Sequence, residues 1–249
     1  MYFISMGFER RGEWARLPQA EQQRRIRKHQ EGLSRLYAER VAAARPHLSL
    51  SVGLHDDVAE TVVRYDGARA VVTDGPFAES KEVLAGFDLI NFDSREDAIA
   101  WQQSLGFDHE GHISEVRGVQ GAALFLHSHR PTTATKYLML FAKNGRPGVL
   151  EMHNRAGTEY VMKGFADESI CLATARLADP ADARTLRLRG GKSIVSDGPF
   201  AEGREVIGGL VVLDCVTREN ALEWARRFSE IEGAVTQVIP CGMWYTHSF

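Results

Sequence analysis

Apolar residues recur along the chain with the two periods of regular secondary structure. Runs that alternate or are continuously apolar predict short strands, and an apolar stripe at spacings of three, four and seven predicts a helix over residues 19–45. Ser94 predicts the start of a second helix, since Glu96 and Asp97 follow this N-cap in the first turn. The strands predicted in the first half are residues 2–6, 48–54, 60–65, 69–73, 83–92 and 113–119.

The second half repeats this order of elements. A helix is predicted around residues 149–163, and another begins after Thr217 as its N-cap. In each half the order is βαβ, an extra hairpin, then βαβ, which indicates a ferredoxin-like α+β unit with helices on one face of its sheet. The other half is expected to cover the second face. The strands predicted here are residues 137–141, 170–176, 185–188, 193–196, 206–213 and 235–240.

An internal repeat in the sequence supports this duplication. Residues 74–101 align without a gap to residues 197–224, an offset of 123 with 13 identities in 28 positions. The offset is about half the chain, so a whole domain is duplicated, rather than the shorter unit of a solenoid. We therefore expect two domains, residues 1–122 and 135–249, joined by a Ser-, Thr- and His-rich linker.

Composition and charge exclude several classes of protein. With 249 residues, 44% of them hydrophobic, and a net charge of −3, the chain is neither disordered nor basic enough to suggest a nucleic-acid partner. No apolar run could span a bilayer, and the first residues lack the pattern of a secretory signal. The three cysteines are odd in number, and none forms a Cys-x-x-Cys pair. We expect a cytoplasmic protein without membrane, nucleic-acid, metal or cofactor binding.

The repeated turn carries a family resemblance. Residues 74–82 read Asp-Gly-Pro-Phe-Ala-Glu-Ser-Lys-Glu, with Gly86 downstream, and residues 197–205 match the same pattern. This motif resembles the DGPF branch of the YCII-related family, in the dimeric α+β barrel superfamily. Members are usually single-domain dimers, so the resemblance implies that the tandem chain forms an intramolecular pseudo-dimeric α+β barrel from two ferredoxin-like units. Because such relatives differ in activity, the fold alone does not assign one.

The resemblance also implies catalytic candidates. Relatives proposed to be enzymes are thought to use a His/Asp pair with the histidine near the first helix, a part that His29 could play. Asp74 and Asp197, the first residues of the two turns, are candidate general bases or substrate anchors. Both turns also have a purely structural interpretation, and His29 has one as a partly buried residue on the apolar stripe. These alternatives remain open.

Basic residues near the turns are candidates for binding an anionic substrate. Lys81 and Arg204 follow the two turns, and Arg64 lies on a strand that precedes the first. A solvated surface cluster is the alternative interpretation. The pairs His109-x-x-His112 and His127-x-His129 lack carboxylate or thiolate partners at ligand spacing, so no metal site is predicted.

Two functions follow from these residues. One is a small-molecule-binding protein of unsettled activity, and the alternative is a cofactor-independent isomerase or lyase that uses acid/base chemistry on a small, anionic or aromatic-derived substrate. The first half is the better candidate for the site, because it keeps Ser80-Lys81 after the turn and has the longer first helix. Whether two tandem chains form a homodimer is left open.

Overall fold

The structure is a computed structural model of the chain. It describes residues 1–45, 48–54, 61–66, 68–74, 82–105, 112–124, 136–142, 171–200, 207–232 and 235–248. The linker expected at residues 127–135 and the helix expected at 149–163 lie outside these ranges. The strands are β1 (Tyr2–Arg10), β2 (Leu48–Leu54), β3 (Thr61–Tyr65), β4 (Ala70–Asp74), β5 (Glu82–Asn91), β6 (Ile113–Leu124), β7 (Lys136–Ala142), β8 (Cys171–Leu177), β9 (Arg184–Arg189), β10 (Lys192–Asp197), β11 (Ile207–Asp214) and β12 (Val235–Ser248).

Three of the described helices begin where the sequence predicts, whereas the short helix at Glu13–Arg16 was not predicted. The Ser94 Oγ accepts a hydrogen bond from the backbone N–H of Asp97 (3.0 Å), and the Thr217 Oγ1 accepts one from Asn220 (3.2 Å). None of the described helices is long and apolar enough to cross a membrane. The helices are α1 (Glu13–Arg16), α2 (Gln19–Ala42), α3 (Arg95–Ser104) and α5 (Arg218–Glu232), with a 3₁₀ turn at Pro180–Asp182.

Eight strands close into an antiparallel barrel. Around the ring the order is β1, β5, β2, β12, β7, β11, β8 and β6, and β6 pairs with β1 again. The described residues of the first half contribute β6-β1-β5-β2 and those of the second contribute β12-β7-β11-β8, which is the same order of equivalent strands. The fold is therefore α+β, as expected, and the two halves share one sheet.

Two long strands join the halves. Residues 113–118 of β6 pair with β1, and the remainder of the strand pairs with β8. In the same way, residues 235–240 of β12 pair with β7, and residues 241–248 pair with β2. Each strand thus contributes hydrogen bonds to its own half and then to the other, and these bonds close the barrel.

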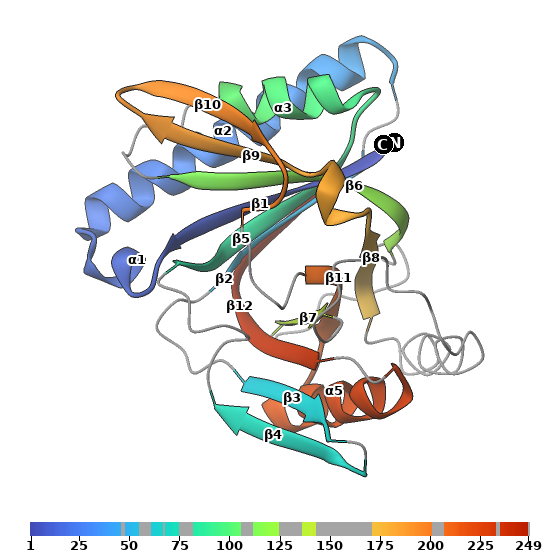
Figure 1. The fold of residues 1–249 in the computed structure, drawn as a ribbon. Helices are drawn as coiled ribbons and strands as arrows, with labels where there is room; N and C mark the ends of the chain where they lie inside the picture. The colour runs from blue at the N-terminus through green and yellow to red at the C-terminus, as the bar shows by residue number, and fades with distance from the viewer. Residues whose placement is uncertain are drawn as a thin grey trace.

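The two extra hairpins are exchanged between the halves. Strand β3 pairs with β12, so the β3–β4 hairpin of the first half extends the sheet of the second. Strand β9 pairs with β6, so the β9–β10 hairpin of the second half extends the sheet of the first. In Figure 1, β3 and β4 lie beside α5, whereas β9 and β10 lie near α2 and α3 on the opposite side of the molecule.

Three apolar clusters stabilise this arrangement. The barrel interior is filled from both halves, for example by Ile4 and Leu138. A second cluster packs α2 and α3 against the outer face of the first half and includes Leu186 of β9. A third packs α5 against the second half and includes Val63 of β3. The exchanged hairpins therefore contribute core residues as well as backbone hydrogen bonds.

Candidate functional site

A cavity of about 330 Å³ lies between α1, α2 and the outer face of the first half of the sheet. Successive side chains of a strand point to opposite faces, and Ile4 and Met6 of β1 fill the barrel interior. Ser5, Gly7 and Glu9 therefore face the helices, and all three line the cavity. The alternation in β1 thus gives an apolar inner face and a polar outer one.

The floor of the cavity is a row of three glycines on adjacent strands. Gly7 of β1 lies opposite Gly86 of β5, which lies opposite Gly53 of β2. A Cβ atom on Gly86 would lie only 2.6 Å from the carbonyl oxygen of Val52, so close strand packing excludes a side chain there. With no side chain on any of the three, the space above the row stays open.

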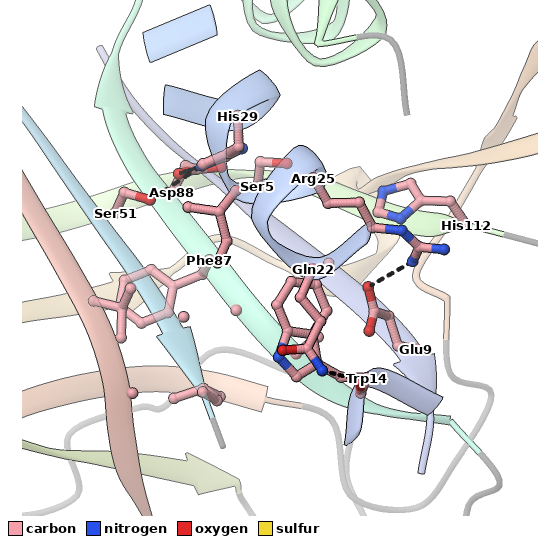
Figure 2. Close-up of a pocket in the computed structure, with 18 of the residues that line it drawn as sticks. Ser5, Glu9, Trp14, Gln22, Arg25, His29, Ser51, Phe87, Asp88 and His112 are labelled. Carbon is pink, nitrogen blue, oxygen red and sulfur yellow. Dashed lines mark hydrogen bonds and ion pairs between the residues drawn. The ribbon is translucent and has the colours of Figure 1, made fainter. Parts of the chain in front are cut away.

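His29 of α2 and Asp88 of β5 form an ion pair at one end of the cavity (Figure 2). The His29 Nε2 is 3.0 Å from the Asp88 Oδ1 and 3.2 Å from the Ser51 Oγ. The side chains of His29 and Asp88 are 23% and 8% exposed. Burial alone lowers the pKa of His29, but the charge and hydrogen bond of Asp88 outweigh it, so the pKa lies above the ordinary 6.5.

A second polar contact continues this end of the cavity. The Ser5 Oγ of β1 donates a hydrogen bond of 2.6 Å to the Gln102 Oε1 of α3, and both residues are buried. Both also line the cavity. The outer face here therefore has a hydrogen-bonded polar lining instead of the apolar packing that is usual under a helix.

The opposite end of the cavity carries Arg25, Glu9 and His112 (Figure 2). The Arg25 Nε is 2.9 Å from the Glu21 carboxylate, while its Nη1 is 4.0 Å from the Glu9 Oε1. This Nη1 is buried and has no hydrogen-bond partner among the described residues. The wall includes Trp14, whose carbonyl oxygen accepts a hydrogen bond of 2.9 Å from the Gln22 amide.

The structure places Asp74 and Arg64 away from this cavity. Both belong to the exchanged hairpin, which pairs with β12 of the second half. Asp74 is exposed, and neither residue lines the cavity around His29. Asp74 therefore does not join His29 at this cavity, and the catalytic role of Asp74 stays a prediction.

Asp197 lies on β10 at the edge of the sheet. Its side chain is 89% exposed and forms an ion pair of 3.1 Å with Arg184. Like Asp74, it is not a wall of the cavity, and its catalytic role also stays a prediction. Lys81 and Arg204, the expected anion-binding residues, lie outside the described residues.

The turn that begins at Asp197 is anchored on the first half. Gly198 has a φ of 90°, a left-handed conformation that favours glycine. The backbone N–H of Phe200 donates a hydrogen bond of 2.9 Å to Glu115, and the Phe200 ring lies 4.7 Å from that of Phe8. Glu115 is itself held by buried Arg117. These contacts fit the structural interpretation of the motif in this copy.

The remaining histidines and cysteines form no candidate metal site in the described part of the chain. No group of three or more His, Cys, Asp or Glu residues there could hold a metal ion. Burial raises the pKa of Cys171 and Cys241 to about 12, so both thiols are protonated at neutral pH. His112 lines the cavity, whereas His109 lies outside the described residues.

Sequence reasoning missed most of this cavity. Asp88 lies inside the strand predicted at residues 83–92, and no role was predicted for Arg25. A position-by-position comparison of the copies contains a signal, because Val211 stands at the position equivalent to Asp88. A carboxylate at the position of a core valine indicates a role other than packing.

Comparisons with known proteins bear on the family. An uncharacterized protein of Rhizobium meliloti (strain 1021) is 46% identical over 55 residues, which are 22% of this chain and 44% of that protein. The chain thus spans less than half of that relative's length. Two solved structures cover nearly the whole chain: a heme-binding protein from Thermus thermophilus and an anthrone oxidase-like protein. The match to the heme-binding protein covers 96% of this chain and 90% of that protein, at 11% identity and a TM-score of 0.36. The match to the anthrone oxidase-like protein covers 98% of this chain and 93% of that protein, at 9% identity and a TM-score of 0.34.

These TM-scores are too low to transfer a fold or a ligand. The family is established instead by the sequence model of the YCII-related domain, which matches residues 10–119 and again residues 136–241. The two matches cover most of the chain and lie one in each half. The chain therefore belongs to the YCII-related family and carries its domain twice.

Proposed function

We propose that the chain binds a small organic molecule in the cavity of its first half. The observation that carries this proposal is the His29–Asp88 ion pair, which lies beside a floor made of three glycines. A buried carboxylate lowers stability unless it is partnered, and a glycine row gives up side-chain packing. Both features are unfavourable for packing alone, and both are useful in a binding site.

The cavity has the size and character of a ligand site. Its volume of about 330 Å³ falls in the range of small-molecule pockets. Apolar walls come from Ile26 and Val83, and polar groups converge at the two ends. A mostly apolar molecule with polar groups at its ends is therefore the class of ligand that this site fits.

Native mass spectrometry of the purified chain, with extraction of any bound compound, tests the proposal. The informative variant is Gly7→Leu, because the nearest atom to a new Cβ lies 3.8 Å away and the longer side chain extends into the cavity. Gly118→Ala, on the same sheet but outside the cavity, is the control. We expect a bound molecule in the parent and control but not in Gly7→Leu. Retention of the same ligand by Gly7→Leu would contradict the assignment.

Acid/base catalysis is the second candidate function, and the geometry of His29 favours it. A neutral imidazole that donates from Nε2 to Asp88 carries its lone pair on Nδ1, and Asp88 raises the pKa of this imidazole, which makes it a better proton acceptor. An isomerase or lyase needs such a group beside the bound substrate. Once a ligand is identified, Asp88→Asn should slow turnover more than it weakens binding, whereas a pure binding protein would show no turnover to lose.

We also propose that the halves are ferredoxin-like domains, residues 1–122 and 135–249, that form an intramolecular pseudo-dimer of the DGPF branch. The equal strand order of the halves and the exchanged hairpins support this arrangement. A protease site inserted between residues 124 and 136 provides the test. After cleavage we expect one complex of both fragments in native mass spectrometry. Separation of the fragments without denaturant would contradict the pseudo-dimer.

A further inference from the structure

We propose that Arg25 and Glu9 together bind a hydroxyl group on a planar ring, so that the ligand of the cavity is a neutral phenol-type molecule. This inference rests on the proposed function, since it names the class of ligand for the same cavity. It adds the group that is recognised at the end opposite His29, and it assigns specificity to two residues that the family motif does not contain.

The first observation is an unsatisfied donor. Arg25 lines the cavity, and its Nη1 is buried and has no hydrogen-bond partner among the described residues. Its distance to the Glu9 Oε1 is 4.0 Å, which is too long for a hydrogen bond. The same guanidinium uses its Nε for Glu21 at 2.9 Å, and that contact holds the group in place. A buried charged donor without an acceptor is unfavourable, so a ligand oxygen at this end is stabilised.

The second observation selects the kind of oxygen. Arg25 and Glu9 each have a side chain that is only 14% exposed, so their opposite charges act on the ligand together. A carboxylate ligand would be attracted by Arg25 and repelled by Glu9, whereas an ammonium group would be attracted by Glu9 and repelled by Arg25. A hydroxyl accepts from the Arg25 Nη1 and donates to the Glu9 carboxylate, so it fits both partners without adding a charge.

The third observation concerns the shape of the ligand. The row of Gly7, Gly86 and Gly53 presents backbone without Cβ atoms, which makes this part of the floor flat. Trp14 adds an aromatic side chain to the wall (Figure 2). A flat aromatic ring can lie against such a surface over its whole face, whereas a puckered aliphatic ring cannot. These features together point to a ring hydroxyl held at the Arg25 end.

Three matched naphthalenes test the inference by isothermal titration calorimetry at neutral pH. The probes are 2-naphthol, 2-methoxynaphthalene and 2-naphthoate, which share the ring and differ in the polar group. The ether cannot donate to Glu9, and the carboxylate is repelled by it. We expect 2-naphthol to bind the parent at least about tenfold more tightly than either other probe, the effect of one charged hydrogen bond.

Variants then separate the two partners. Glu9→Gln should raise the affinity for 2-naphthoate and reduce the preference for 2-naphthol, since the repulsion is gone. Arg25→Met keeps the aliphatic stem and should reduce the affinity for 2-naphthol by about tenfold. Arg24→Met is the matched control, because Arg24 also pairs with Glu21 but does not line the cavity. Thermal melting of each variant checks that it is folded.

The outcomes distinguish this inference from the proposed function. Equal binding of all three probes, or an unchanged preference in both cavity variants, would overturn the role of Arg25 and Glu9 and leave the cavity as a binding site. Tighter binding of 2-naphthoate than of 2-naphthol would overturn the preference for a hydroxyl. If no probe binds and Gly7→Leu also leaves any co-purified ligand in place, the proposed function fails together with the inference.

Discussion

The two halves share a backbone arrangement, but around Asp88 and its equivalent Val211 the first half carries polar side chains where the second half is mostly apolar. Asp88 lies opposite Ser51 across β5 and β2, while Val211 lies opposite Thr174 across β11 and β8. Ser5 lies opposite Asp88 on the other side, where the second half has Met139 opposite Val211. Val211 and Met139 belong to the apolar cluster under α5. A polar lining in one copy is therefore a packed core in the other.

The cavity floor differs in the same way. The row Gly7-Gly86-Gly53 corresponds in register to Phe141-Gly209-Arg176, so only the central glycine is shared. Close strand approach explains a glycine at the centre, but not the two beside it. The fold itself accepts large residues at the outer positions. The open floor of the first half is thus a property of its sequence and not a requirement of the fold.

The largest loss of stability is expected when a carboxylate is introduced into the second half at the position equivalent to Asp88. Val211→Asp places a carboxylate at a position that is 1% exposed and packed among apolar side chains. We expect it to lower the free energy of unfolding by about 3–5 kcal/mol, measured by urea denaturation. The reverse change, Asp88→Val, should lower it by about 1 kcal/mol or less, because the cavity leaves His29 partly solvated. Equal losses in both variants would break the comparison.

The shared glycine provides a test of close packing. In Gly86→Ala the new Cβ would lie 2.6 Å from the Val52 carbonyl oxygen, so β5 or β2 must shift. We expect a loss of about 1–3 kcal/mol in the free energy of unfolding. By contrast, Gly7→Ala has its nearest contact at 3.8 Å and should change stability much less. Similar melting temperatures for the two variants would show that the central glycine is not required by packing.

The turn at Gly198 is expected to have a smaller effect. A β-branched residue is strained at a φ of 90°, so Gly198→Val should lower the free energy of unfolding by about 1–3 kcal/mol, at or below the loss expected for Gly86→Ala. Differential scanning calorimetry measures this change. Gly191→Ala, in the hairpin at a φ of 73°, is a matched control for positive φ without contacts to the first half. A parent-like melting temperature for Gly198→Val would contradict the structural interpretation of the motif.

The free energy of unfolding should depend on pH through the His29–Asp88 pair of the first half. Because the pKa of His29 is raised in the folded state, its pairing with Asp88 stabilises the fold fully below the unfolded pKa of about 6.5. That contribution is lost as the pH rises through the folded pKa. The difference in unfolding free energy between the parent and His29→Gln should therefore shrink between pH 5.5 and 8.5, to be followed by urea denaturation. A difference that grows over this range would show that the pKa of His29 is lowered, and not raised, in the folded state.

The smallest effect is expected at the edge of the sheet. Asp197→Asn removes an exposed ion pair with Arg184, which should change the free energy of unfolding by less than about 0.5 kcal/mol. Asp74→Asn, at the equivalent exposed position, should behave alike. If ligand binding in the cavity is unchanged in both, the aspartates of the turns are not the site. A selective loss of binding in Asp74→Asn would restore the role that the sequence predicts for it.

The local fold was predictable because it depends on local patterns. Alternation placed β2 at its observed bounds, and the cap at Ser94 located α3, since both signals lie within a few residues. His29 was selected on family resemblance and does line the cavity. Its partner Asp88 was missed because a strand pattern records hydrophobicity and does not show which face a polar residue takes.

The exchange of hairpins was the main feature that no pattern could show. Strand β3 has the same composition whether it pairs within its own half or with β12, and the choice depends on contacts distant in sequence. This is why the sequence did not show that Asp74 and Arg64 lie on the sheet of the other half, away from His29. The predicted site residues of the second half also did not include Phe200, whose ring lies against Phe8 and whose backbone N–H bonds to Glu115.

The pairing of β12 with β2 has a consequence for synthesis of the chain on the ribosome. Strand β12 pairs with β2, which belongs to the part of the sheet that emerges first. Until β12 is released, β2 presents unpaired backbone groups, and a β3–β4 hairpin has no strand to join. Most residues that line the cavity of the first half are therefore translated early, but the barrel beneath it closes only after β12 has left the ribosome.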